Sequence, residues 1–318
     1  MRRLVALLVI SIVISIASIA CADLQAHFLD VGHGDCIIIM CDGAAMVVDG
    51  GGAAKSDLLY TYLTKQEITH VQAVIGTHPD NDHVGGLPAV FHAATVGTLY
   101  VPIIDHTAER HTVLIEKAHE MGTEIVIPNN GDSFTLGAAT VTFYKLPKEA
   151  QSDNDLSLVT HIVYGKHSFL LCADIDKDYE LALMNGGYDL KATVLKVAHH
   201  GSDASSSMQF LAASHPAYAI ISGNSQYESP KDEVPAKIIA EGSTLLHTKQ
   251  NGHIVITSTG EKIKIKTSRN YVGNSGTFVF HEKGCRHVKD MKAKNKSTIY
   301  TREQAIATGY TPCKTCDP

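Results

Sequence analysis

Four side chains of metal-ligating type lie within six positions of the segment GTHPDNDHVGG, residues 76–86: His78, Asp80, Asp82 and His83. Imidazole nitrogens and carboxylate oxygens at this spacing can converge on one or two divalent metal ions. A polar turn that only caps the following helix would need one acid and neither histidine. The segment therefore favours a metal site over a capping turn.

More residues of ligand type come directly after other apolar runs. FLLCADID brings Asp174, and LKVAHHGSD brings His199 and His200. Two further runs, FLDVGHGDC and MVVDGGG, bring Asp30, His33, Asp35 and Asp49. Such side chains are poorly placed for core packing and well placed for a site at the rim of a sheet. We expect these segments to meet at one site.

The chain resembles the metallo-β-lactamase superfamily in six segments that occur in the family's order. They read FLDVGHGDCIII, MVVDGGG, THPDNDHVGG, NDLSLV, LLCADI and LKVAHHGSDASS. More narrowly, they are similar to the hydrolase domain at the C-terminus of ComEC-type competence proteins. The resemblance covers about residues 24–267, and several motifs in order are far more specific than one. It implies an α/β fold, an αββα sandwich, with one or two metals at the edge of the paired sheets.

The resemblance also implies which residues hold the metals. These are His78 and Asp80 for the first metal, Asp82, His83 and His200 for the second, and Asp174 as a bridge between them. His200 is preferred over His199 because a glycine follows it, as in related loops. His199 is then free to contact the substrate.

Other residues are expected to act on the substrate or to orient the ligands. The catalytic candidates are Asp82, His199 and Lys196. The candidates for orienting a ligand or facing a phosphate are Asp30, His33, Asp35, Asp49, Asn154, Ser202 and Asn224. Carboxylates are suited to the first of these tasks because a ligating imidazole usually donates its other N–H to one.

Two positions depart from the broad superfamily. Asp80 stands where a histidine is usual, and Asn154 stands near the place of another histidine. His161 lies inside a strand-like run and is interpreted as a core histidine. An acid among the ligands makes the site harder, which favours Mn²⁺ or Mg²⁺ alongside Zn²⁺.

A hydroxide generated at such a site could attack a phosphodiester, because bound metals lower the pKa of water and stabilise the phosphoryl transition state. The resemblance to competence proteins implies that the substrate is DNA. The same fold could instead hydrolyse a β-lactam or another small ester, because a fold does not fix chemistry. A third hypothesis is a nucleic-acid-binding protein with a vestigial hydrolase site.

A second constellation lies at the C-terminus, where His281 and Cys285 form one close pair and Cys313 and Cys316 another. This spacing is typical of structural zinc, with His287 as an alternative ligand. Residues 278–318 are too few to bury much core, so a metal would stabilise them. Two disulfides or a redox Cys-x-x-Cys are the competing interpretations.

The same segment resembles the metal-binding domain of Ada-type DNA-repair proteins in the stretch TREQAIATGYTPCKTC. It departs from that family at His281, where the family has a cysteine. The basic residues between the two ligand pairs could contact phosphates without reading sequence; they are Arg286, Lys289, Lys292, Lys294 and Lys296.

The elements that must position these residues alternate in type. Short apolar runs bounded by glycine predict strands, and periodic segments predict helices near 57–66, 108–121, 176–185, 206–213 and 234–241. Ser56 is expected to cap the first helix. The Gly-, Ser- and Asn-rich residues 268–277 are expected to link a hydrolase domain, 23–267, to the zinc-binding module, 278–318.

Charge and the N-terminus bear on partners and location. The 318 residues carry a net charge of −6, yet residues 261–318 hold twelve Lys and Arg against five acids. An acidic body and a basic tail suggest different partners, with DNA for the tail. Residues 1–22 are interpreted as a Sec-type signal peptide cleaved after Ala22, so that the protein is secreted or periplasmic. A retained anchor and a lipoprotein modified at Cys21 are the alternatives.

The remaining cysteines, Cys36, Cys41 and Cys172, lie in apolar strand-like runs. They are interpreted as buried small hydrophobes. A disulfide among them is the alternative.

Overall fold

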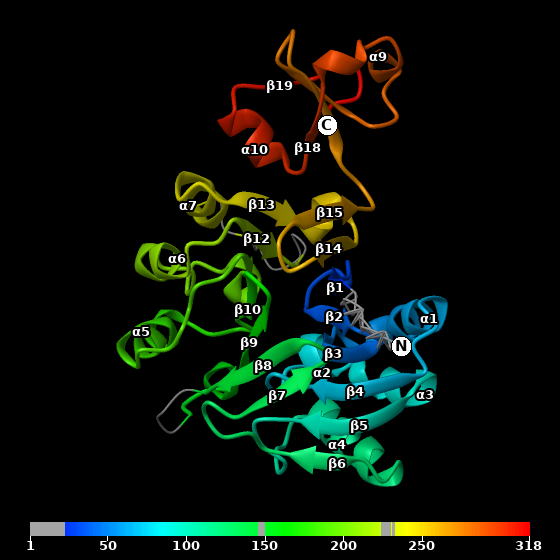
Figure 1. The fold of residues 1–318 in the computed structure, drawn as a ribbon, viewed down its shortest axis with the longest axis vertical. Coiled ribbons are helices and arrows are strands. Elements are labelled where there is room, and N and C mark those ends of the chain that lie inside the picture. Colours follow the sequence, from blue (N-terminus) through cyan, green and yellow to red (C-terminus); the bar gives the residue numbers. More distant parts are fainter. Residues whose placement is uncertain (1–22, 146–149, 224–229, 231–232) are drawn as a thin grey trace, which may run out of the picture.

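The structure, a computed structural model, describes residues 23–145, 150–223, 230 and 233–318 (Figure 1). The expected signal peptide, residues 1–22, and Asn224 lie outside these residues. Within the described ranges, every helix is too short or too polar to span a membrane.

Two large sheets form most of the described chain. The first has the order β15 (Ile263–Thr267), β14 (Ile254–Ser258), β1 (Leu24–Phe28), β2 (Cys36–Cys41), β3 (Ala44–Gly50), β4 (His70–Ile75), β5 (Thr95–Tyr100) and β6 (Glu124–Val126). The second has the order β13 (Thr244–His247), β12 (Tyr218–Ile221), β11 (Val194–Lys196), β10 (His167–Leu171), β9 (Val159–Tyr164), β8 (Ala139–Tyr144) and β7 (Ser133–Leu136).

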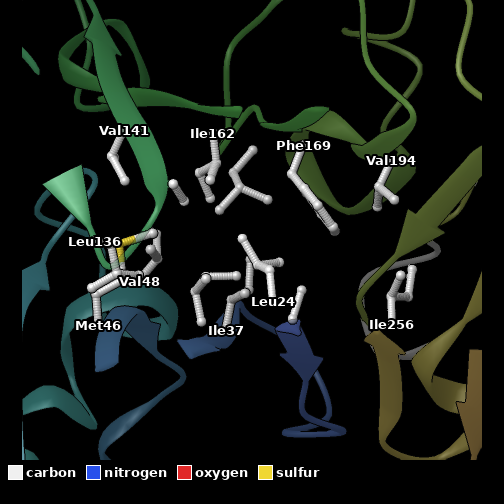
Figure 2. Close-up of a cluster of buried hydrophobic side chains, with 14 of the residues drawn as sticks. Leu24, Ile37, Met46, Val48, Leu136, Val141, Ile162, Phe169, Val194 and Ile256 are labelled. Carbon is white, nitrogen blue, oxygen red and sulfur yellow. The ribbon is translucent and has the colours of Figure 1, made fainter. Parts of the chain in front are cut away.

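The sheets pack face to face through an apolar core (Figure 2). Along β1, Leu24, Ala26 and Phe28 point into this core, because alternate residues of a strand share a face. Strand β2 is apolar on both faces, and Ile38 packs on its outer side. Full burial of a side chain such as Phe169 stabilises the fold by roughly 1.5–3 kcal/mol. The inter-sheet core therefore fixes the position of the strand ends.

Helices cover the outer faces of both sheets and bury two further apolar layers. The first sheet is covered by α1 (Ser56–Lys65), η2 (Leu87–Ala89), α3 (Val90–Ala93) and α4 (Glu109–Glu120). The second is covered by α5 (Lys177–Asn185), α6 (Met208–Ser214) and α7 (Glu233–Ala240). The expected αββα sandwich is thus confirmed.

One helix start differs from the expectation. Lys55 is the N-cap of α1, and Ser56 is its first residue. The Ser56 hydroxyl donates to the carbonyl of Ala53 at 2.8 Å, because the short η1 (Ala53–Lys55) leads directly into α1. Ser56 therefore joins the two helices and does not cap the second.

A separate four-stranded sheet forms the C-terminal module, and it corrects the expected domain boundary. Its order is β18 (Lys296–Ile299), β16 (Tyr271–Asn274), β17 (Val279–Glu282) and β19 (Thr311–Pro312). It also contains α9 (Arg286–Lys289), η6 (Ala293–Asn295) and α10 (Arg302–Ala307).

Strand β16 lies within the segment expected to be a linker and pairs with both β17 and β18. Gly273 serves packing there, since a Cβ atom would come within 2.5 Å of Ser297 Oγ. We therefore call residues 271–318 the C-terminal module and residues 23–270 the body.

Candidate metal centre

The strand ends of both sheets bring the expected ligand loops together. Three of these loops follow β1, β3 and β4 of the first sheet, and two follow β10 and β11 of the second. They include α2 (Asn81–Val84) and η4 (Ala198–Gly201). Asp49, His199 and His200 have left-handed φ values of 57°, 49° and 54°. Such conformations cost free energy and cluster at functional sites, where the surroundings enforce them.

One ligand group consists of His78, His83 and Asp174, whose ligand atoms lie within 4.8 Å of one another. All three side chains are buried. Their facing atoms, Nε2 of both histidines and Oδ1 of Asp174, have no hydrogen-bond partner among the described residues. Burying such atoms unsatisfied is costly, so the group fits a bound cation. Asp80 lies beside it, with Oδ2 3.5 Å from His78 Nε2.

A second ligand group consists of His33, Asp82 and His200. Asp82 Oδ2 lies 3.2 Å from His33 Nε2 and 3.4 Å from His200 Nε2. Asp174 faces both groups, with Oδ1 3.3 Å from His83 Nε2 and Oδ2 3.4 Å from His200 Nε2. Asp174 is therefore the residue that would be shared by metals held at the two groups.

The grouping differs from the expectation at two histidines. His83 was expected beside Asp82 but sits with His78, and its Nε2 is 3.9 Å from Asp82 Oδ2. His33 was expected to orient a ligand or face a phosphate but lies among the ligands themselves. Its signal in the sequence is the Gly32-His33-Gly34 triplet, whose glycines have φ values of 80° and 114°. Only a backbone free to take such values turns His33 into the site.

Asp49 orients the first group, as expected. Its Oδ2 accepts from His83 Nδ1 at 2.7 Å and from the Thr77 hydroxyl at 2.8 Å. Its Oδ1 accepts from the Thr77 N–H at 2.9 Å, and Thr77 Oγ1 lies 3.1 Å from His78 Nδ1. A ligating imidazole held in this way keeps Nε2 directed at the metal.

Asp35 orients the second group, and Lys196 stands behind it. His200 Nδ1 lies 3.2 Å from the Ser222 carbonyl and 3.4 Å from Asp35 Oδ1, which also accepts from the Ser222 hydroxyl. Asp35 Oδ2 is 2.7 Å from Lys196 Nζ, which also donates to the carbonyl of Val197 at 3.0 Å. Lys196 is fully buried, so the expectation that it contacts substrate is wrong. A lysine in this place balances the charge of Asp35.

The electrostatic field of the site favours positive charge. Burial alone would raise the pKa of Asp35, but Lys196 and His200 hold it well below its ordinary value. Burial opposes ionisation of Asp82 too, yet His200 and His83 lower its pKa to about 2. Asp174 raises the pKa of both His83 and His200 well above the ordinary value, against the effect of burial. The carboxylates therefore favour protonation of these histidines, and the same negative charge would stabilise a bound divalent cation.

The two adjacent histidines differ in exposure. His200 is fully buried, whereas the His199 side chain is 33% exposed. His199 Nε2 lies 3.8 Å from Asp174 Oδ2, on the open side of the site. His161 is a core histidine, with Nδ1 3.2 Å from the Tyr144 hydroxyl and Nε2 3.3 Å from the Lys191 carbonyl.

Three other expected residues lie outside the two ligand groups. Asp30 Oδ2 pairs with Arg269 Nη2 at 2.5 Å, so it does not orient a ligand as expected. The Ser202 hydroxyl accepts the N–H of Ala204 at 3.2 Å, as in a local turn. Asn154 lies in η3 (Asn154–Leu156). Shortly after η3, the Leu158 N–H donates a hydrogen bond to the Thr77 carbonyl at 2.9 Å.

The C-terminal module gathers the four residues expected to bind zinc. The ligand atoms of His281, Cys285, Cys313 and Cys316 lie within 4.8 Å of one another. His281 Nδ1 is buried without a hydrogen-bond partner among the described residues. The N–H groups of Thr315 and Cys316 lower the pKa of Cys313 to about 7, against the effect of burial. The thiolate and the unsatisfied imidazole fit a bound metal.

The structure also bears on two of the alternatives for this module, the His287 ligand and the disulfides. His287 Nε2 lies 3.0 Å from the Thr315 hydroxyl, outside the ligand group. All six described cysteines have free thiols, so neither Cys36, Cys41 and Cys172 nor the module's cysteines form disulfides. The module's apolar core is small: among the described residues, its buried cluster consists of Phe280, Ile299 and Ala305. A metal is therefore suited to hold it together.

Comparison with known proteins agrees with this geometry. The family model described as Metallo-beta-lactamase superfamily matches residues 29–225. ComE operon protein 3 of Bacillus subtilis is 29% identical over 253 residues, which cover 72% of this chain and 32% of that protein. Recombination protein 2 of Haemophilus influenzae is 26% identical over 259 residues, which cover 77% of this chain and 30% of that protein. Competence protein ComA of Neisseria gonorrhoeae is 27% identical over 229 residues, which cover 70% of this chain and 30% of that protein.

The chain thus spans about a third of the length of these relatives. Among solved structures, it is similar in fold to the metallo-beta-lactamase fold protein YhfI from Bacillus subtilis, with a TM-score of 0.52 and 15% identity. That likeness covers 74% of this chain and 100% of YhfI. With the sandwich, the ligand loops and the family match in agreement, the chain belongs to the metallo-β-lactamase superfamily and is similar to one part of ComEC-type competence proteins.

Proposed function

We propose that this protein is a metal-dependent hydrolase, and specifically a phosphodiesterase that cleaves DNA. The observation that carries the proposal is the pair of ligand groups that share Asp174. Bound divalent metals would supply a hydroxide nucleophile near neutral pH and positive charge for an in-line phosphoryl transition state. The relatives named for competence and recombination support DNA as the substrate.

The chain's own residues prepare this chemistry. Asp49 holds His83 at 2.7 Å, and the buried Asp35 carboxylate faces His200 Nδ1, so the ligand nitrogens need little reorganisation. His199, on the open side, is placed to contact a phosphate oxygen or the leaving group. Asp80 adds a carboxylate beside His78, which supports use of Mn²⁺ alongside Zn²⁺.

The C-terminal module would hold one structural zinc and help to retain the nucleic acid. Its exposed basic residues are of the type that contacts phosphates without reading sequence; they include Arg286, Lys289, Lys292, Lys294 and Lys296. Residues 1–22 would direct export, so that the DNA is met in the periplasm or outside the cell. Detection of the mature protein beginning at Asp23 in a periplasmic or medium fraction would test export.

The test of function is cleavage of supercoiled plasmid DNA by the purified protein with Mn²⁺ or Zn²⁺. We expect nicking that falls by more than about 100-fold in Asp82→Ala and in Asp174→Asn, because each removes a metal ligand. Asp57→Ala, which removes an exposed acid of α1, is the matched control and should cleave normally.

Two outcomes would contradict the proposal. One is no DNA cleavage with any metal, or undiminished cleavage by Asp82→Ala. The other is turnover of a chromogenic β-lactam while DNA stays intact, which would favour a small-ester or β-lactam hydrolase.

A further inference from the structure

A hollow of about 430 Å³ lies where the C-terminal module meets the body. The body contributes Lys249 and Arg269 to its lining, and the module contributes Tyr271, Glu282 and Lys283. None of these residues belongs to either metal site. Figure 1 shows the region above β15, where the chain passes from the body into the module.

The two walls of this hollow are held together by polar contacts. Asn251, a buried residue of α8 (Thr248–Asn251), donates from Nδ2 to the Tyr300 carbonyl at 2.6 Å. Gln250 accepts the Arg302 N–H at 2.8 Å and donates to both carboxylate oxygens of Glu303 at 3.0 and 2.8 Å. The hollow is therefore formed before any ligand arrives, which lowers the entropic cost of binding.

The lining is cationic although the body is acidic. Lys249, Arg269 and Lys283 are all exposed, and Glu282 is the acid among them. Residues 1–260 carry 15 basic and 28 acidic side chains, a net charge of −13. A polyanion would be repelled by most of that surface and drawn to this hollow.

A second hollow, of about 560 Å³, continues the cationic surface and shares Ser268 with the first. Lys264 and Lys266 point into it from one face of β15, and Lys65 approaches from α1. Asp23 is the acid of its lining. We call the two hollows together the cationic band.

One end of the cationic band reaches the loop that carries a metal ligand. Arg269 Nη2 bonds Asp30 Oδ2 at 2.5 Å, and His33 lies three positions beyond Asp30. The Asp30 N–H also donates to His253 Nδ1 at 2.9 Å, and His253 lines the second hollow. The loop is thus shared by the metal centre and the cationic band.

We propose that the cationic band binds the sugar–phosphate backbone of a nucleic-acid strand and leads it to the metal centre. The identity of the bound strand as nucleic acid rests on the proposed function. The binding itself is assigned to surfaces outside the metal-binding residues. Lysine and arginine contact phosphates whatever the base sequence, so the cationic band would position the strand without sequence specificity.

The test measures binding of a fluorescent phosphorothioate oligonucleotide to the full, metal-loaded protein at several salt concentrations. We expect Lys249→Ala/Lys283→Ala and Lys264→Ala/Lys266→Ala each to weaken binding about tenfold near 0.1 M salt. Each should also reduce the salt slope by about 1 to 2, because two phosphate contacts are lost. Lys117→Ala/Lys237→Ala is the matched control, because these two lysines line neither hollow and each pairs with an acid of its own helix.

Unchanged affinity and salt slope in both band variants would overturn the inference. The inference would also be overturned if the protein bound phosphatidylglycerol vesicles but did not bind the oligonucleotide. Hydrolysis of bis(p-nitrophenyl) phosphate by the unaltered protein separates the two claims. If no diester is hydrolysed with any metal but the band variants lose oligonucleotide binding, the proposed function fails and the inference stands.

Discussion

At the scale of single residues, the buried Asp35 connects a lysine to a metal ligand. Its two oxygens face Lys196 Nζ at 2.7 Å and His200 Nδ1 at 3.4 Å. All three side chains are buried, so each charge depends on its neighbour for compensation. The lysine therefore acts through Asp35 on the orientation of His200.

Replacing Lys196 by Met should leave the Asp35 carboxylate buried without its counter-charge. We expect a loss of about 3–5 kcal/mol in the free energy of unfolding. Affinity at the second ligand group should fall about 10- to 100-fold, because the residue that orients His200 is disturbed. Chemical denaturation and metal titration measure the two effects.

The double variant Asp35→Asn/Lys196→Met is the control for this prediction. It leaves no buried unpaired charge at the site and keeps an oxygen acceptor for His200 Nδ1. It should therefore be more stable than Lys196→Met alone. Equal stability of the two variants would show that the Asp35–Lys196 pair does not act as described.

At the scale of elements, the metal centre depends on how closely its loops approach one another. The Asp35 N–H donates to the Asp82 carbonyl at 3.2 Å, which joins the loop after β1 to α2. Gly34 makes this approach possible, because a Cβ atom there would lie 2.1 Å from the Asp82 carbonyl oxygen. The glycine also has a φ of 114°, which other residues rarely adopt.

We therefore expect Gly34→Ala to separate this loop from α2 and to displace both His33 and Asp82. The free energy of unfolding should fall by more than about 2 kcal/mol, and metal binding should weaken. Gly43→Ala is the matched control: Gly43 also has a positive φ, of 80°, but nothing lies within 4 Å of its Cβ position. It should cost only about 1 kcal/mol and leave metal content unchanged. Equal effects of the two substitutions would contradict this explanation.

His247 makes one helix cap sensitive to pH. Its Nδ1 accepts the Lys249 N–H at 3.0 Å at the start of α8, and burial together with Lys249 lowers its pKa to about 4. In the unfolded chain the ordinary value is about 6.5, so the unfolded state takes up a proton first as pH falls. This contribution to stability is complete above about pH 6.5 and is lost progressively towards pH 4, at about 1.4 kcal/mol per pH unit.

His247→Asn should reduce this loss, because asparagine also caps helices and does not titrate. We expect similar free energies of unfolding near pH 7.5 and a shallower decline between pH 6.5 and 4. His27, whose pKa burial also lowers to about 4, should preserve part of the decline. Denaturant titrations across this pH range provide the measurement, and an unchanged slope would contradict the assignment.

At the scale of the whole molecule, body and module are stabilised differently. The body has three extensive apolar layers, whereas the module encloses a small core and a group of four metal ligands. Polar contacts from Gln250 and Asn251 then attach the module to the body. Loss of the module's metal should therefore unfold the module and leave the sandwich intact.

Cys313→Ser/Cys316→Ser tests this division. We expect one fewer tightly bound zinc per chain by elemental analysis, and early proteolysis confined to residues 271–318. Cys172→Ala is the control: it removes a buried body thiol and should keep the full zinc content, although it lowers stability. Unchanged zinc in the double variant would exclude the four-ligand site.

Much of the fold was predictable because its signals are local. The periodic segments and apolar runs gave the helices α1, α4, α5, α6 and α7 within a few residues. Strands β7 and β13 were missed, since each is only four residues long. Strand β16 was assigned to a linker because Gly273 suggests a turn until its contact with Ser297 is known.

The sequence by itself determined the chemistry that is possible: histidines and acids directly after apolar runs of the body, and a histidine and cysteines at metal-ligating spacing in the module. Only the tertiary structure decided how they divide. It placed His33 among the ligands, moved His83 beside His78, and buried Lys196 behind Asp35. The reason is that residue type alone decides whether a side chain can bind a metal. Which side chains share a metal depends on the strand ends that the inter-sheet core brings together, and those ends are far apart in the chain.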